Sequence, residues 1–318
     1  MQRTQLRTVP LGGTGLEITR VGFGAWAVGG GGERGWGPQA DGESIAAIHR
    51  ALELGVNWID TAAAYGFGRS ERVVGQALAD VDERPYVFTK ASLLDDGTRH
   101  IRHVLKRDSI LREAEASLQR LGVDAIDLYQ IHWPIPDEDI EEGWAAMAEL
   151  KERGLVRHIG VSNFSADQLR RIQSIAPVET IQPPYSLIDR AAEAEILPHA
   201  QRDGIGVIVY SPMGSGLLTG AMTRERIATL PADDWRSRDV RFAEPRVSGH
   251  LALAARLRAV ADRRGVTPGA VAVAWTLRNP AVDGAITGFR RPGQVDPILA
   301  AADLELTAQD MTEIEAAN

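Results

Sequence analysis

The chain has 318 residues, of which 44% are hydrophobic and 25% are charged, as is ordinary for a globular protein. Its net charge of −8 argues against a nucleic-acid-binding surface, and no apolar run reaches the roughly 20 residues that a membrane helix needs. The absence of cysteine excludes disulfides and thiolate chemistry. The seven histidines lack metal-site spacing, so we expect no metal. Residues 1–4 open no apolar signal region, and we expect a cytoplasmic protein.

Strands and helices are predicted to alternate along nearly the whole chain, after an N-terminal hairpin over residues 7–19. The predicted strands that follow cover residues 20–24, 56–60, 86–90, 126–132, 156–161, 178–182, 206–210 and 283–287. The first predicted helix begins near Asp41, which can cap it. Further helices are predicted over residues 69–78, 110–121, 138–153, 251–264 and 268–278, one more begins at Ser165, and another runs through Ile196.

Eight strands alternating with helices predict an α/β fold, namely a (β/α)8 TIM barrel as a single domain over residues 1–318. The N-terminal β-hairpin precedes the barrel, and long loops are expected at its C-terminal face. A doubly wound sheet is the alternative, because residues 22–27 match the G-x-G-x-x-A dinucleotide fingerprint after a strand. The glycine-rich run over residues 28–35 cannot open a helix, so it argues against that alternative.

Three consecutive predicted strands end in a titratable side chain. Asp60, Lys90 and His132 occupy these ends, and Tyr65 lies in the turn after Asp60. A lone aspartate at a strand end is more often a turn residue or a helix cap. In a barrel, however, the reacting groups come from the carboxyl ends of several strands. We therefore expect these four side chains to meet in one site.

These four residue types suit the reduction of a carbonyl group. An ammonium beside a phenol favours the phenolate, so Lys90 is expected to lower the pKa of Tyr65. Asp60 would supply the counter-charge that keeps Lys90 protonated, and His132 can orient a substrate oxygen by hydrogen bonding. The set predicts a site that polarises a carbonyl and hands it a proton.

The sequence resembles the aldo-keto reductase family over nearly its whole length. The motifs that carry the resemblance are residues 57–66 (NWIDTAAAYG), Lys90, residues 128–134 (LYQIHWP) and residues 159–164 (IGVSNF). It is similar to bacterial members in the branches related to potassium-channel β-subunits and inositol-utilisation proteins. The resemblance implies that Asp60, Tyr65, Lys90 and His132 form a catalytic tetrad. It also implies that NADPH delivers hydride to an aldehyde or ketone, or that an alcohol is oxidised in reverse.

The resemblance also implies a set of cofactor-binding residues. These are Ser162, Asn163, Gln182, Tyr210, Ser211, Pro212, Met213, Gly214, Ser215, Gly216, Leu217, Gly288, Arg290 and Gln294. Tyr210 would stack on the nicotinamide, residues 211–218 would hold the pyrophosphate unless their glycines simply form a turn, and Arg290 would favour NADPH over NADH. Residues 297–298 read Pro-Ile where many relatives carry Glu-Asn facing the adenine. Arg291 and Gln294 are candidates to compensate.

The substrate is a small carbonyl compound that the sequence does not specify further. Trp26 and Trp133 follow strand ends, and each is expected either to wall the pocket or to pack in the core. Further candidates are Trp36, Phe67 and residues 93–106. The irregular segment over residues 221–247 is expected to cover the cofactor phosphates, to contact another subunit in a homo-oligomer, or to be a solvated excursion. The alternative function is an NADP(H)-binding regulatory subunit with little turnover.

Overall fold

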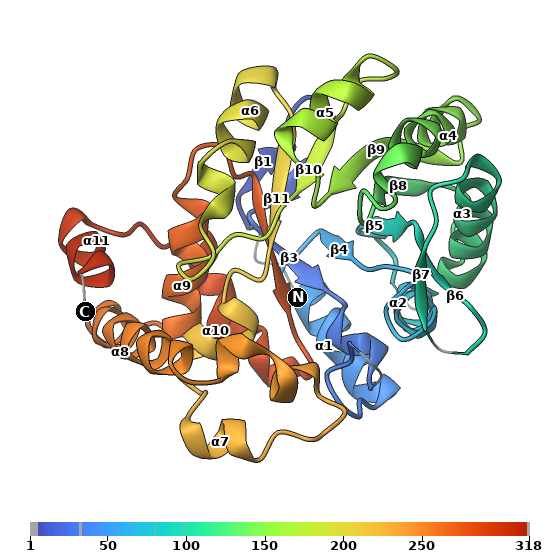
Figure 1. The fold of residues 1–318 in the computed structure, drawn as a ribbon. Helices are drawn as coiled ribbons and strands as arrows, with labels where there is room; N and C mark the ends of the chain where they lie inside the picture. Colours follow the sequence, from blue (N-terminus) through green and yellow to red (C-terminus); the bar gives the residue numbers. More distant parts are fainter. Residues whose placement is uncertain (1–5, 32–33, 80, 99, 317–318) are drawn as a thin grey trace.

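The computed structural model describes residues 6–31, 34–79, 81–98 and 100–316. Parallel strands close into a barrel, and the helices surround it (Figure 1). In chain order the barrel strands are β3 (Val21–Gly24), β4 (Trp58–Asp60), β5 (Tyr86–Ala91), β8 (Ile126–Ile131), β9 (Val156–Ser162), β10 (Thr180–Gln182), β11 (Gly206–Tyr210) and β12 (Gly284–Gly288). Closure of β12 onto β3 confirms the predicted (β/α)8 barrel and excludes an open, doubly wound sheet.

The helices lie close to the predicted positions. Those outside the barrel are α1 (Asp41–Glu53), α2 (Arg69–Ala79), α3 (Arg107–Leu121), α4 (Ile140–Glu152), α5 (Ala166–Gln173), α6 (Ile196–Asp203), α8 (Arg246–Arg264) and α9 (Pro268–Leu277). Three further helices are α7 (Arg224–Ala228), α10 (Asp296–Leu299) and α11 (Ala308–Glu315). Ser165 caps α5 with a full capping box. The predicted cap at Asp41 is wrong, because Ala40 is the N-cap and Asp41 is already helical, where its charge suits the helix dipole.

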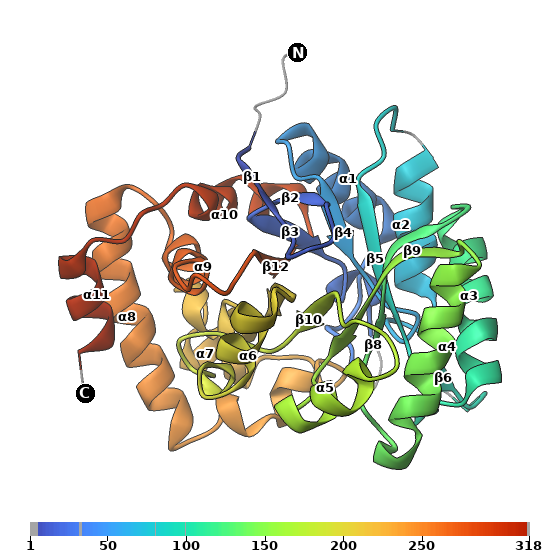
Figure 2. The same cartoon turned by 90° about the horizontal axis from the view of Figure 1, so that it is seen from above.

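The N-terminal hairpin is confirmed as β1 (Thr8–Pro10) paired antiparallel with β2 (Glu17–Thr19). Figure 2 shows it beside β3 and β4. Apolar side chains from this hairpin region pack on side chains inside the barrel, namely Leu11, Leu16 and Ile18 against Trp58, Phe88, Leu128, Ile208 and Ile286. Trp58 is the first residue of β4, so the hairpin covers the amino ends of the strands. The carboxyl ends, at the opposite mouth, are left for the functional loops.

A second hairpin, which the sequence did not predict, follows β5. Strands β6 (Leu93–Asp95) and β7 (Ile101–His103) pair antiparallel within the segment that was expected to be a loop. The segment over residues 221–247 holds the short helix α7, short 3-10 turns and the first two residues of α8. No helix among the described residues is long and apolar enough to cross a membrane.

Candidate active site

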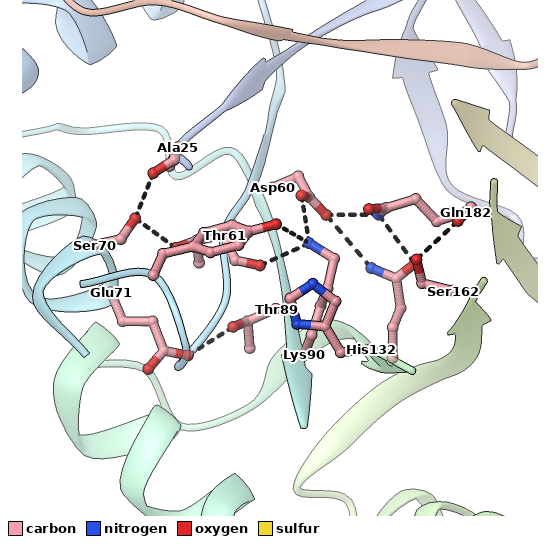
Figure 3. A network of polar contacts seen from close by, with 12 residues as sticks. Ala25, Asp60, Thr61, Ser70, Glu71, Thr89, Lys90, His132, Ser162 and Gln182 are labelled. Carbon is pink, nitrogen blue, oxygen red and sulfur yellow. Dashed lines mark hydrogen bonds and ion pairs between the residues drawn. The ribbon is translucent and has the colours of Figure 1, made fainter. Parts of the chain in front are cut away.

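The four predicted catalytic residues lie together at the carboxyl ends of the strands. Asp60 ends β4, Lys90 lies near the end of β5, and His132 directly follows β8, while Tyr65 comes from the loop after β4. Their side chains converge around the ammonium group of Lys90 (Figure 3). The barrel therefore brings together residues that are up to 72 positions apart in the sequence, from Asp60 to His132.

Lys90 is the centre of the cluster. Its Nζ donates to Asp60 Oδ1 at 2.6 Å, to the carbonyl oxygen of Thr61 at 3.0 Å and to the Tyr65 hydroxyl at 3.3 Å. The side chains of the ion pair are 0% and 3% exposed, so solvent hardly screens it. Burial lowers the pKa of Lys90 and the Asp60 carboxylate raises it. Three acceptors match the three donors of the ammonium, which is how a buried charge is accommodated.

The other oxygen of Asp60 is held by two glutamines. Gln182 Nε2 donates to Asp60 Oδ2 at 2.9 Å, and Gln130 Nε2 approaches it at 3.4 Å. Gln182 also donates to Gln130 Oε1 at 3.3 Å. The carboxylate is thus fixed at both oxygens, so its position relative to Lys90 is set by β8 and β10 as well as by β5.

Tyr65 and His132 face each other across the site. Their ring centroids are 5.7 Å apart and their planes stand at 82°. Burial lowers the pKa of His132 well below its ordinary value, and the charge of Lys90 lowers it further. The imidazole is therefore neutral at neutral pH.

The expectation that Lys90 makes Tyr65 more acidic is wrong for this arrangement. Burial raises the pKa of Tyr65 well above its ordinary value, and the nearby Asp60 carboxylate raises it further. The physical reason is burial, which penalises the charged phenolate, while the Lys90 ammonium lies closer to Asp60, at 2.6 Å, than to Tyr65, at 3.3 Å. Tyr65 consequently carries its proton at neutral pH.

A second polar cluster adjoins the tetrad. Ser162 Oγ donates to the carbonyl oxygen of Gln182 at 2.8 Å, and Asn163 Nδ2 donates to the carbonyl oxygen of His132 at 2.9 Å. The Tyr210 hydroxyl donates to Asn163 Oδ1 at 2.8 Å. The residues that the sequence predicted at the nicotinamide are therefore gathered beside the tetrad, from the ends of β9, β10 and β11.

The segment over residues 211–217 contains four residues in left-handed backbone conformations. Ser211, Gly214, Ser215 and Gly216 have φ values of 57°, 57°, 56° and 99°. The Ser215 hydroxyl is buried and has no hydrogen-bond partner among the described residues. Arg236 reaches over the loop from the 221–247 segment, with a guanidinium nitrogen 3.5 Å from the carbonyl oxygen of Ser215. An unpaired hydroxyl beside a buried guanidinium suits a phosphate group.

Arg290, the predicted ligand of the adenosine phosphate, is held in place by the loop after β3. Its Nε donates to Gln39 Oε1 at 2.8 Å, and a second guanidinium nitrogen donates to the carbonyl oxygen of Pro38. Its backbone N–H donates to Gln294 Oε1 at 2.8 Å. Burial lowers the pKa of Arg290, and the cations of Arg236 and Arg291 lower it further. Neighbouring cations of this kind favour an anion between or beside them.

Tryptophan side chains form one wall of the site. Trp26 stacks on Tyr65 with a centroid distance of 6.2 Å and on Trp235 at 5.5 Å, and its ring meets that of Trp36 edge-on at 5.2 Å. Trp26 therefore lies against the predicted proton donor. Trp133 directly follows His132 and is half-buried.

The 221–247 segment reaches across the barrel mouth to the loop after β3. Trp36 and Asp234 form an antiparallel bridge, and the backbone N–H of Trp235 donates to the carbonyl oxygen of Gly35 at 3.1 Å. Arg236 pairs with Asp234 at 2.6 Å within the segment, and its guanidinium lies 4.6 Å from the Trp36 ring centroid. The segment thus places Trp235 on the aromatic wall and Arg236 on the 211–217 loop.

Comparison with known proteins identifies the family. The sequence profile of the aldo/keto reductase family matches residues 20–318. The chain belongs to this family. It is 41% identical over 304 residues to the aldo-keto reductase YhdN of Bacillus subtilis, covering 95% of this chain and 90% of that protein. It is 36% identical over 321 residues to the NADH-specific methylglyoxal reductase of Escherichia coli, covering 96% and 97%.

A solved structure of the family shares the fold closely. The glycerol dehydrogenase AKR11B4 of Gluconobacter oxydans superposes with a TM-score of 0.87 at 38% identity, over 97% of this chain and 94% of that one. Membership makes the chain an oxidoreductase of carbonyl groups that uses a nicotinamide cofactor. The choice between NADPH and NADH is not fixed by membership, since the Escherichia coli relative is NADH-specific.

Several residues of this aldo/keto reductase site were missed by sequence reasoning. Gln130 carried a signal, because it lies two residues before His132 on one strand and so points to the same side. Trp235 and Arg236 lay in a segment without periodicity, and nothing in the sequence fixed which of its side chains would reach the mouth. Among the described residues, no three potential ligands of the histidine, cysteine, aspartate or glutamate type are grouped to hold a metal.

The charge balance of the reductase site makes a prediction for His132. Burial is the largest cause of the lowered His132 pKa, and Lys90→Met removes the cation that lowers it further, so the pKa should rise. An NMR titration of the imidazole measures it. Lys106→Met, at an exposed lysine paired with Asp139, is the control and should leave the titration unchanged. An unchanged or lower His132 pKa in Lys90→Met would contradict the electrostatic account.

Proposed function

We propose that the chain is an NADPH-dependent reductase of aldehydes or ketones in which Tyr65 donates the proton, with alcohol oxidation as the reverse reaction. The observation that carries the proposal is that Lys90 joins Asp60 and Tyr65 in one buried cluster, at 2.6 and 3.3 Å. Such a cluster at the carboxyl mouth of a barrel is placed to act on a bound substrate.

The states of the four side chains suit proton donation. Tyr65 holds its proton because its pKa is raised. As the substrate oxygen gains negative charge, the phenol O–H bond breaks and a new O–H bond forms on the substrate. The Lys90 ammonium, 3.3 Å from the Tyr65 oxygen, would then attract the phenolate more strongly than it attracts the neutral phenol. Neutral His132 orients the substrate oxygen by hydrogen bonding without placing a second cation beside Lys90.

The residues around the tetrad fit a nicotinamide dinucleotide. When bound, the reduced nicotinamide would supply the hydride that the carbonyl carbon receives. Ser162, Asn163, Gln182 and Tyr210 would hold its ring and carboxamide. The pyrophosphate would lie on the 211–217 loop under Arg236, as the unpaired hydroxyl of Ser215 supports. Gly288, Arg290 and Gln294 would face the adenosine end.

The preference for NADPH over NADH rests on the cations at that end. Arg290 is fixed by Gln39 and Pro38 and lies close to Arg236 and Arg291, which suits the extra phosphate of NADPH. The NADH-specific relative from Escherichia coli is the reason that this preference needs a direct test.

The substrate is proposed to bind against the tryptophan wall. Trp26, stacked on Tyr65, is placed to contact a carbonyl compound bound at the phenol, and Trp133 beside His132 would close the other side. Because the relatives named above act on methylglyoxal and glycerol, both compounds belong in a substrate screen beside aromatic and aliphatic aldehydes.

Tyr65→Phe should lower kcat by about 10²- to 10⁴-fold, the usual contribution of a positioned acid, and leave cofactor affinity within about twofold. Steady-state turnover with the aldehyde panel and a fluorescence titration of the cofactor measure both. Tyr86→Phe, at the amino end of β5, is the matched control. Turnover of Tyr65→Phe near that of the unaltered chain would refute the donor assignment. Unaltered protein that binds cofactor but turns over far below about 1 per second would favour the regulatory alternative.

Arg290→Ala should weaken NADPH binding by about 10- to 100-fold, because a charge-assisted contact to the extra phosphate is lost, and should leave NADH binding unchanged. Dissociation constants from cofactor fluorescence give the comparison. Arg112→Ala, at an exposed arginine of α3, serves as control. An equal loss for both cofactors would contradict the assignment of Arg290 to that phosphate.

A further inference from the structure

Ser92 is a junction between the strand ends that carry the tetrad. Its backbone N–H donates to Glu113 Oε2 at 2.9 Å, and its carbonyl oxygen accepts from the Val104 N–H at 3.1 Å. Its hydroxyl lies 3.4 Å from both the backbone nitrogen and the carbonyl oxygen of Trp133. Its φ is 80°, in a region that residues other than glycine rarely adopt. Contacts on every polar group hold this serine in that conformation.

The junction lies next to two tetrad residues without touching the reacting atoms. Ser92 comes two residues after Lys90, and its partner Trp133 directly follows His132. The backbone N–H of His132 donates to the carbonyl oxygen of Ala91 at 3.1 Å. The ends of β5 and β8 are therefore joined by this bond as well as by the contacts between Ser92 and Trp133. A shift of Ser92 would therefore change the separation between Lys90 and His132.

Glu113 reaches the Ser92 junction from a helix outside the barrel. It lies on α3, is 5% exposed, and uses both carboxyl oxygens, since Oε1 accepts from Ser109 Oγ at 3.0 Å and Oε2 from Ser92. No cation in the part of the chain that the structure describes forms an ion pair with it. Arg120 of its own helix lowers its pKa and Glu71 of α2 raises it, but burial is the largest effect and brings the pKa to about 7.

A buried carboxyl group without an ion-pair partner is costly for a fold, and an apolar side chain could dock α3 as well. What an apolar side chain cannot do is accept the hydrogen bond of a strained backbone N–H. We therefore take the hydrogen bond to the Ser92 N–H as the main structural role of the Glu113 carboxyl group.

We propose that Glu113 is a positioning residue of the reductase. Its carboxyl group fixes Ser92, and through Ser92 it fixes the ends of β5 and β8, so that Lys90 and His132 keep the separation that proton transfer requires. This inference rests on the proposed reductase function of the tetrad. Glu113 touches neither the substrate nor the cofactor, so it acts on turnover through geometry alone.

The test compares two variants of similar volume. Glu113→Gln keeps a carbonyl oxygen for the Ser92 N–H, whereas Glu113→Leu keeps the bulk and removes the acceptor. We expect kcat to fall about tenfold in Glu113→Leu and to stay within about twofold in Glu113→Gln, with cofactor affinity unchanged in both, because small misplacements of reacting groups slow turnover. Glu115→Leu, at an exposed position of the same helix, is the control. Equal kcat in the Leu and Gln variants would overturn the proposal.

A double-mutant cycle tests the route through Ser92. Ser92→Ala retains the N–H that Glu113 accepts but loses the contact with Trp133, and its kcat should fall about threefold or more. The double variant with Glu113→Leu should lose less than the product of the two single losses. A fully multiplicative loss, or unchanged kcat in Ser92→Ala, would overturn the route. The Ser92→Ala result decides the matter if Glu113→Leu fails to fold.

A spectroscopic readout separates this inference from the proposed function. If the unaltered protein shows no turnover with any carbonyl compound, the proposed function fails, and kcat then says nothing about Glu113. The NMR signals of the His132 ring still report the geometry of the junction. They should shift in Glu113→Leu and keep their positions in Glu113→Gln; unshifted signals in the Leu variant would reject the positioning role.

Discussion

The buried ion pair between Lys90 and Asp60 is the interaction on which the rest of the site depends. Removing two charges from water costs several kcal/mol for each ion, so the pair persists only where geometry and further hydrogen bonds are favourable. The barrel meets that condition with the Thr61 carbonyl oxygen on one side and with Gln130 and Gln182 on the other. Strands β4, β5, β8 and β10 all contribute, so the closed barrel is what makes the pair tenable.

The protonation states of the other two tetrad residues follow from this pair. Burial and the Asp60 carboxylate raise the pKa of Tyr65, so the phenol keeps its proton, while burial and the Lys90 cation lower the pKa of the neighbouring His132. A protonated phenol and a neutral imidazole are the states that a carbonyl reductase needs before the reaction. In the proposed reaction, the Lys90 charge would stabilise the phenolate that forms once Tyr65 has given up its proton. The Lys90 cation is thus placed to stabilise the phenolate form of Tyr65 more than the neutral phenol.

The barrel and the positions of the tetrad residues could be predicted because both depend on short sequence patterns. Strand periodicity gives the alternation, and the strand ends give Asp60, Lys90 and His132. The pKa of Tyr65 could not be predicted, since its direction depends mainly on how deeply the folded barrel buries the phenol, and the sequence alone does not show that. Contacts between distant loops, such as Trp36 with Asp234, leave no periodic signal either. The β6–β7 hairpin was missed because its strands are only three residues long, which is too short to show a strand periodicity.

The central claim is that Lys90 and Asp60 act as one unit in the reaction, and a double-mutant cycle of Lys90→Met and Asp60→Asn on the rate of a single turnover tests it most directly. If the two act as a unit, each single variant loses most of the rate and the double variant is little slower than the slower single one. Losses that multiply would show that the two side chains contribute independently, and would contradict the account.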